Sequence, residues 1–528
     1  MKKRLLKLSS LFLALTMVLS LFCAASLTSN AETNVIYVDA TINEDDASTN
    51  TYKTLATAVS KATAGTSSAM GTTIMFKSDY TVTSSVSVNK KYITIDLNKH
   101  IFTAEGTNAK GIAVSTKGVV IQNGTMRLDA SNANDAQYNC IFIDNNDSSK
   151  KTTIKNIAFE FVAMPTKSGD LVTNPGALIR NYSTVSNTTN VYNCSFKCNN
   201  SVTANASLAS LVACSTTSMN FYNCSFDGNG IFSGIQVRAN DSNQRGRVGI
   251  YNCNFSNVNY LFSKSSGKQS NTDTSIKSQA TIYGATVNNA KALCAEPDNV
   301  TITAGKHATM PDLTTLTSPY SFTVLCNHEY NEATGVCNNC KANKPIIEMQ
   351  EGAAMRIDGK TEGIRFSATV STSDHAALQN DLHATITDYG MLVVPKANIL
   401  NTAMIVENSE TSTENNIAEN PDVVAAKYGT ETKPAEVPDT GKIQIVGSLV
   451  KIKAENAKTD YVARAFIEYT VQGDATPHYI YSDIGDARSI GFIANEIRNG
   501  SGADSGYYGS LCGNHKKVVD DWADKYNS

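Results

Sequence analysis

Short runs in which apolar and polar residues alternate recur between about residues 74 and 302. A period of two is typical of β-strands that bury one face. Ahead of these runs, the apolar run at 35–38 predicts one more strand, and residues 52–62 place Leu55, Ala58, Val59 and Ala62 on one helical face. The pattern therefore predicts a strand and a helix that cap a long series of strands.

The runs form a repeat of 29–37 residues. One position of the repeat is held in turn by Asn123, Asn156, Asn193, Asn223, Asn252 and Gly284. The positions two before and three after it are apolar in every copy, so they should point inward. Asn tolerates a positive φ and its amide both donates and accepts, so we expect a buried asparagine ladder at a bend.

Cysteines hold the next, inward position in three consecutive repeats, as Cys194, Cys224 and Cys253. Neighbouring strands about 4.8 Å apart could bring two of them within disulfide reach. Three in one stack cannot all pair, so we favour free thiols that serve as small apolar core residues.

Two outward rows are candidate ligand surfaces. One is a row of tyrosines, Tyr192, Tyr222, Tyr251 and Tyr283. The other lies on a second strand of each repeat and consists of Asp144, Arg180, Arg238 and Lys264. Stacked tyrosines can simply cover one another or a loop, and the charges can simply be solvated. If either row binds a ligand, the tyrosines suit neutral sugars and the basic row suits acidic ones.

The asparagine-marked repeat resembles the pectate lyase-like right-handed parallel β-helix superfamily over residues 32–310. This resemblance implies an all-β solenoid and an extracellular polysaccharide or cell-wall glycan as partner. The superfamily's lyases hold calcium with clustered carboxylates, whereas only Asp144 and Asp147 lie near the basic row. Paired aspartates of the polygalacturonase type are also missing, so we assign no catalytic residue. A non-catalytic, carbohydrate-binding or adhesive surface protein is the leading reading, and a polysaccharide lyase or glycoside hydrolase is the alternative.

Residues 326–341 carry Cys326, His328, Cys337 and Cys340 in the pattern C-x-H-x8-C-x2-C. Four soft ligands at this spacing suit tetrahedral zinc, and so short a segment cannot bury a core of its own. Disulfides are the general alternative outside the cell, but they make no use of the histidine. The sequence therefore predicts a structural zinc knuckle.

Residues 346–528 contain alternating runs at 363–370, 389–395, 446–452 and 461–469, which predict a β-sandwich. The polar stretch 408–440 is expected to be an exposed loop, and 515–526 a short helix. This module resembles those at the ends of Gram-positive surface proteins. Its arginines, Arg356, Arg365, Arg464 and Arg488, suit either anion binding or structural ion pairs.

The N-terminal segment has Lys2, Lys3, Arg4 and Lys7 before an apolar run, then a small-x-Ala pattern that ends at Ala31. This is typical of a signal peptide, residues 1–31, cleaved after Ala31, and it predicts a secreted or cell-surface protein. Without these four basic residues, 41 basic residues remain against 48 acidic ones, a net charge of about −7, which disfavours nucleic-acid partners. No later run is long enough to span a membrane.

Overall fold

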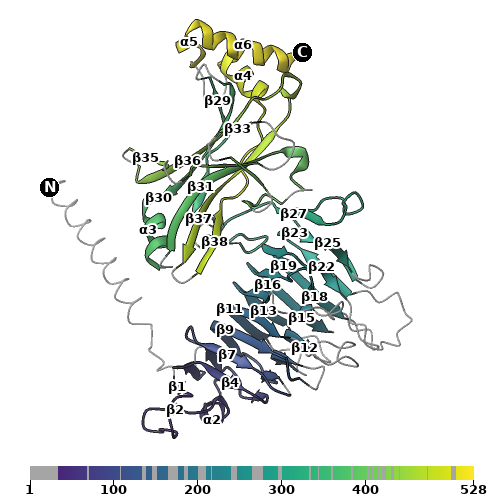
Figure 1. The fold of residues 1–528 in the computed structure, drawn as a ribbon, viewed down its shortest axis with the longest axis vertical. Coiled ribbons are helices and arrows are strands. Elements are labelled where there is room, and N and C mark those ends of the chain that lie inside the picture. Colours follow the sequence, from purple (N-terminus) through teal and green to yellow (C-terminus); the bar gives the residue numbers. More distant parts are fainter. Residues whose placement is uncertain are drawn as a thin grey trace, which may run out of the picture. The chain divides into compact units, whose positions relative to one another are not determined.

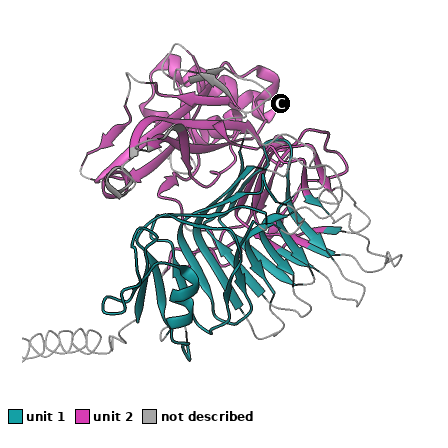
Figure 2. Cartoon of the chain, turned by 60° about the horizontal axis from the view of Figure 1, so that its bottom comes forward, with its two compact units in different colours: residues 1–248, 262–279, 295–301 teal, residues 249–261, 280–294, 302–528 magenta. Residues whose placement is uncertain are grey.

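The protein is described by a computed structural model in which mainly β-structure is arranged in two compact units (Figures 1 and 2). Unit 1 contains residues 1–248, 262–279 and 295–301, and unit 2 contains residues 249–261, 280–294 and 302–528. The structure describes residues 34–528 with gaps at 68–70, 108, 134–137, 145–150, 164–175, 183–187, 200–209, 216, 239–245, 264–277, 295–299, 332–333, 343, 358–360, 382–383, 401–402, 407–408, 413–415, 419–423, 430–432, 439, 472–473 and 501–506. The predicted signal peptide lies outside the described residues.

The described part of unit 1 begins with a strand and a helix, as predicted. The elements up to the first long strands are β1 (Val35–Val38), β2 (Thr51–Tyr52), α2 (Leu55–Lys61), β3 (Thr73–Phe76), β4 (Tyr80–Val82), β5 (Val86–Val88), β6 (Thr94–Asp96) and β7 (Ile101–Ala104). The Thr54 hydroxyl accepts a hydrogen bond from the backbone N–H of Thr57 and so caps α2. Leu55, Ala58 and Val59 are buried, which confirms the predicted helical face.

The repeats then supply strands that pair in parallel with the equivalent strand of the next repeat (Figure 1). Their bounds are β8 (Lys110–Val114), β9 (Val120–Asp129), β10 (Asn139–Ile143), β11 (Lys151–Ala163), β12 (Ala177–Tyr182), β13 (Thr188–Tyr192), β14 (Ser195–Cys198), β15 (Ser210–Ser215), β16 (Ser218–Tyr222), β17 (Ser225–Asp227), β18 (Ser233–Arg238), β19 (Arg247–Tyr251), β20 (Cys253–Ser256), β21 (Tyr260–Ser263), β22 (Ser278–Ile282), β23 (Ala285–Ala290), β24 (Ala292–Cys294) and β25 (Val300–Ala304). Phe159, Phe196 and Phe226 align in register and stack inside, at ring-centroid distances of 4.9 Å. Their burial confirms the inward positions read from the repeat.

The asparagine ladder is present, but it is not buried. The φ angles of Asn123, Asn156, Asn193 and Asn223 are 62°, 55°, 51° and 53°. The amides of Asn156, Asn193 and Asn223 each donate to the side-chain oxygen of the preceding asparagine, at 3.1 Å, 3.2 Å and 3.4 Å, and the Asn123 amide donates to Asp96. Asn156 and Asn193 are exposed, and Asn123 and Asn223 are half-buried. The prediction of burial was wrong because a side chain at this bend points away from the core, while its amide still reaches its neighbours along the stack.

The stacked cysteines Cys194, Cys224 and Cys253 are buried and free, which confirms the reading as core thiols. Burial raises the pKa of Cys194 well above its usual value, and a hydrogen bond with Cys224 adds to this. A thiol held in its neutral form behaves as a small apolar side chain.

In unit 2, β23 pairs in parallel with β20, and on its other side β27 (Tyr320–Cys326) runs antiparallel to it. The short strand β26 (Ala308–Thr309) also pairs with β27. This antiparallel strand occupies the place where another repeat would continue the parallel pairing. It leads directly into the cysteine and histidine segment.

The C-terminal part of unit 2 contains two sheets that share a core. Its elements are β28 (Ile347–Met349), β29 (Ala354–Arg356), β30 (Gly363–Ser371), α3 (Thr372–Asp381), β31 (Ala384–Pro395), a 3-10 turn (Lys396–Asn398), β32 (Glu410–Ser412), β33 (Asn416–Ala418), β34 (Val424–Lys427), β35 (Ala435–Val437), β36 (Lys442–Val450), a second 3-10 turn (Ala454–Asn456), β37 (Tyr461–Val471), β38 (Asp474–Tyr481), α4 (Ile490–Asn499), α5 (Tyr507–Ser510) and α6 (Gly513–Asn527). One sheet has the order β28-β30-β36-β33, and in it β29 also pairs with β30 and β35 with β36. The other sheet has the order β32-β34-β31-β37-β38. Phe366, Met391, Ile445 and Ala465, from both sheets, are fully buried in one cluster.

One sequence prediction for this module was wrong. The stretch 408–440 was expected to be an exposed loop, but β34 within it is buried and pairs with β31. Val424, Ala425 and Ala426 form a short apolar run inside a polar segment, and a strand of four residues is too short to show a period. Among the described helices, none has the length and apolar composition needed to cross a membrane.

Candidate functional site

The cysteine and histidine segment folds into one compact cluster. Cys326 is the last residue of β27, and Cys337 and Cys340 flank a tight turn closed by a hydrogen bond from the Lys341 N–H to the Cys337 carbonyl. Lys341 has a φ of 61°. The Asn339 side chain donates to the carbonyl of Asn327 at 2.6 Å and so connects this turn to the segment that carries Cys326 and His328. Donor atoms of Cys326, His328, Cys337 and Cys340 all lie within 4.8 Å of one another, so the group could hold a metal ion.

The distances inside the cluster match a tetrahedral site. The sulfurs of Cys326 and Cys337 are 3.9 Å apart, and the Cys340 sulfur is 3.4 Å from His328 Nδ1. Bond lengths of about 2.3 Å for Zn–S and 2.0–2.1 Å for Zn–N place tetrahedral ligands about 3.8 Å and 3.6 Å apart. A disulfide needs sulfurs at about 2.05 Å, so the observed spacing disagrees with the disulfide alternative.

The pKa values in the cluster favour a thiolate at Cys340. A hydrogen bond with the Cys326 thiol lowers the pKa of Cys340 to about 4, and the same contact raises the pKa of Cys326. Burial lowers the pKa of His328, but the hydrogen bond to Cys340 and the charge of Asp483 outweigh it and raise that pKa to about 9. The sulfurs thus compete for protons, and thiolate is the form that binds metals. A dication would satisfy the same negative charge.

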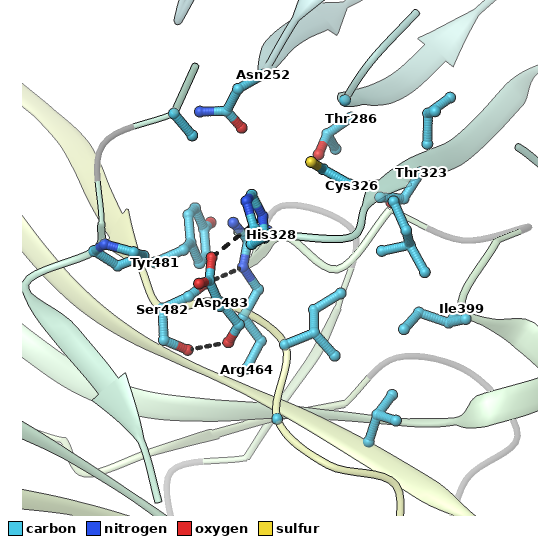
Figure 3. A pocket seen from close by; sticks show the side chains of 18 of the residues that line it. Asn252, Thr286, Thr323, Cys326, His328, Ile399, Arg464, Tyr481, Ser482 and Asp483 are labelled. Atoms are coloured by element: carbon cyan, nitrogen blue, oxygen red, sulfur yellow. Dashed lines mark hydrogen bonds and ion pairs between the residues drawn. The ribbon is translucent and has the colours of Figure 1, made fainter. Parts of the chain in front are cut away.

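Two residues that the sequence reading missed surround the histidine. His328 Nε2, which faces away from the cysteines, lies 3.5 Å from a carboxylate oxygen of Asp483 (Figure 3). Tyr330 donates its hydroxyl to the other oxygen at 2.7 Å and stacks on the His328 ring at 5.2 Å. A carboxylate on the second nitrogen is the usual way to fix the orientation of a metal-binding histidine. Asp483 is 155 residues away in the chain, so no local pattern points to it.

Rings of the tyrosine row stack on one another. The rings of Tyr192 and Tyr222 lie 4.6 Å apart and 11° from parallel, and those of Tyr251 and Tyr283 lie 4.3 Å apart and 6° from parallel. All four are half-buried. Each ring covers a face of its partner, so at most one face per ring of a pair is left for a sugar.

Tyr283 has a structural role. Its ring packs against Cys337 and Cys340, and Gly305 lies so close that an added Cβ would come within 2.2 Å of the ring. This glycine is needed because the backbone passes directly over the aromatic face. The contacts favour the alternative in which this end of the row supports the fold.

One member of the predicted basic row, Arg180, is displaced by two residues from the position that aligns with Arg238. Arg238 aligns with Ser215, and Ser215 aligns with Tyr182, whereas Arg180 aligns with Phe142 and Ala213. Asp144 follows β10 directly and is exposed, and Lys264 lies outside the described residues. A shift of two residues leaves the inward alternation unchanged, so the pattern alone did not fix this register.

The observed register brings Tyr182, Arg180 and Arg238 together, a cluster that was not predicted from the sequence. Tyr182 is 40% exposed, and the guanidinium groups of Arg180 and Arg238 lie over its ring at 5.5 Å and 5.7 Å from the centroid. Arg180 is 7% exposed, and Arg238 is half-buried. We call these three residues the Tyr182 cluster. It combines one exposed aromatic ring with a half-buried and a buried guanidinium on the second parallel sheet.

No model of a known protein family matches the chain, and no curated protein matches it significantly.

Proposed function

We propose that the chain is a secreted or cell-surface protein that binds an acidic polysaccharide. In this proposal the parallel repeats form a right-handed parallel β-helix, the knuckle holds a structural zinc ion, and the C-terminal module is a β-sandwich. The stacked phenylalanines, the asparagine ladder and the parallel pairing of successive repeats support the β-helix.

The observation that carries the proposed function is the Tyr182 cluster. Here one aromatic ring is 40% exposed, and two guanidinium groups lie over it, that of the half-buried Arg238 and that of the buried Arg180. The ring offers an apolar surface to the C–H face of a sugar, and a guanidinium pairs well with a carboxylate. Together they suit a uronic-acid residue of an extended chain.

Tyr182 and Arg238 occupy one row that crosses the strands of the second parallel sheet. Arg238 lies two strands from Tyr182 in the same row, and neighbouring strands are about 4.8 Å apart. The backbone positions are thus about 10 Å apart, and the Arg238 side chain spans this distance, so its guanidinium and the Tyr182 ring can contact one sugar residue together. Asp144 is the carboxylate that the sequence reading placed in the same row, and one carboxylate holds calcium poorly, so binding is favoured over lyase chemistry.

The zinc ion has a structural role in this proposal. Its four ligands leave no open position for water or substrate, as is usual for structural sites. The ligand segment contributes only three residues to a cluster of buried apolar side chains, Cys337, Cys340 and Ala342. The bound ion would therefore supply most of the free energy that orders the segment.

The test is a binding assay of the secreted protein with polygalacturonate and with a neutral galactan of similar length. We expect the acidic polymer to bind, with an affinity that falls as salt rises. Tyr182→Ala and Arg238→Gln should each weaken binding about 10-fold, which is the size expected when one aromatic or charged contact is lost.

Tyr222→Ala is the matched control, because it removes a half-buried tyrosine of the first sheet. It should bind like the parent. Loss of binding in Tyr222→Ala with full binding in Tyr182→Ala would move the site to the tyrosine row. New unsaturated ends on polygalacturonate would instead support the lyase alternative.

A further inference from the structure

A cavity of about 580 Å³ lies within unit 2, beside the cysteine and histidine cluster (Figure 3). Cys326 and His328 form part of its wall, and Arg464, Tyr481 and Asp483 form another part. Small-molecule sites in proteins usually measure about 300–1,000 Å³ and combine apolar walls with a few polar groups. The cavity therefore has the size and the mixed lining of a ligand site.

Arg464 is the side chain that makes this cavity unusual. It lies on β37, and its Nε donates to the Ser482 carbonyl at 2.9 Å, while Nη1 donates to the Met404 carbonyl at 3.2 Å. The guanidinium lies over the Tyr481 ring, 4.5 Å from its centroid. Within the described part of the chain, no carboxylate forms an ion pair with it. Two backbone carbonyls use two of its five N–H groups, and three remain.

The carboxylates in the wall have other partners. Asp483 accepts the Tyr330 hydroxyl and faces His328, and Asp486 accepts the Gly352 N–H at 3.1 Å and lies 3.6 Å from Arg488. Burial lowers the pKa of the half-buried Arg464, and the nearby charge of Asp483 acts in the opposite direction. An arginine nevertheless stays protonated in proteins, so the cation persists.

Two further groups in the lining can assist an anion. Lys396 is exposed at the start of a 3-10 turn, and no ion pair to its side chain is found among the described residues. Thr286, on the wall that β23 supplies, has a half-buried side chain without a hydrogen bond to the described residues. The lining thus offers a fork of N–H donors, a second positive charge and a hydroxyl.

We propose that this cavity binds a small organic carboxylate of monosaccharide size, with the guanidinium of Arg464 as its anchor. The planar guanidinium donates two parallel hydrogen bonds to a carboxylate, a geometry that a neutral sugar cannot copy. Thr286 then meets a hydroxyl group of the ligand, and Lys396 adds attraction at the rim. The ligand is a sugar acid, either a free monosaccharide or the terminal residue of a polymer.

The experiment titrates the full mature chain with D-glucuronate, with D-glucose and with a trigalacturonate, and follows binding by calorimetry and ligand-observed NMR. We expect glucuronate to bind at least 10-fold more tightly than glucose, as expected for loss of one charge-assisted bidentate contact. Tighter binding of the trimer than of glucuronate assigns the site to polymer ends, and equal or weaker binding of the trimer assigns it to free sugar acids; both support a carboxylate site. Equal binding of glucuronate and glucose, or binding of neither, would overturn the proposal.

Variants locate the binding. Arg464→Gln should weaken glucuronate binding at least 10-fold, and Arg498→Gln, which removes a half-buried arginine paired with Asp524, is the matched control that should leave it unchanged. If Arg464→Gln does not fold, Lys396→Gln and Thr286→Phe replace it, because one changes an exposed charge and the other fills the cavity from a half-buried position. Full binding in both would contradict the proposal. Tyr182→Ala should bind glucuronate like the parent, which separates this cavity from the Tyr182 cluster.

Discussion

The exposed asparagine ladder makes a sharp prediction at Asn193. Its side chain donates to Asn156 at 3.2 Å and accepts from Asn223 at 3.4 Å, and its backbone has a φ of 51°. Replacement by glycine keeps the backbone conformation and removes both amide contacts. Replacement by alanine removes the same contacts and keeps the Cβ at positive φ, but it loses the polar side chain whose local hydrogen bonding lets asparagine adopt this conformation.

The magnitudes follow from these two contributions. Both hydrogen bonds are long and solvent-exposed, so their loss should cost about 0.5–1 kcal/mol together, at the low end of the usual range. Glycine adds about 0.5–1 kcal/mol through the greater freedom of the unfolded chain. Alanine instead adds about 1–2 kcal/mol for the left-handed conformation. We therefore expect Asn193→Gly to destabilise by about 1–2 kcal/mol and Asn193→Ala by about 1.5–3 kcal/mol.

Hydrogen exchange measured by mass spectrometry on peptides that cover residues 188–199 gives the local opening free energy of these strands. This readout avoids the global unfolding of a chain with two units, which need not be two-state. Asn254→Ala is the control, because Asn254 is exposed within β20 and has no positive φ. It should change stability by less than about 0.5 kcal/mol. An alanine variant at 193 as stable as the parent would refute the reasoning.

The metal cluster supports two further predictions. Protein purified under reducing conditions should contain one zinc ion per chain, and a strong chelator should lower the midpoint of thermal unfolding of the C-terminal part, because the ion orders a segment without its own core. Mass spectrometry that finds Cys326, Cys337 or Cys340 in disulfides would contradict this. Asp483→Asn should weaken zinc affinity about 10–100-fold, as loss of an outer carboxylate does elsewhere, while Asp486→Asn should not. Unchanged affinity in Asp483→Asn would show that the carboxylate has no part in holding the histidine.

Much of the parallel architecture could be predicted from the sequence because the same pattern of residues recurs in successive repeats. The same apolar, polar and asparagine positions recur in each copy, so one misread residue does not change the reading. The core thiols and the ladder contacts follow from the same source. The capping helix lies outside the repeat and was predicted from its own period of apolar residues.

The failures have a common physical cause. The outward orientation of the ladder depends on the bend angle, and the register of Arg180 depends on loops of unequal length between strands. A period of two cannot distinguish positions that differ by two residues. For this reason the sequence placed Arg180 in the row that Tyr182 occupies, and the aromatic member of the cluster was missed.

Asp483 ties the metal cluster to the cavity. One of its oxygens faces His328 Nε2 and the other accepts the Tyr330 hydroxyl, while the side chain itself lines the space next to Arg464. If a metal ion holds His328 through Nδ1, the imidazole keeps its proton on Nε2 and holds this carboxylate in place. Because both oxygens of Asp483 have these partners, this carboxylate forms no ion pair with Arg464 among the described residues, and the guanidinium keeps free N–H groups toward the cavity.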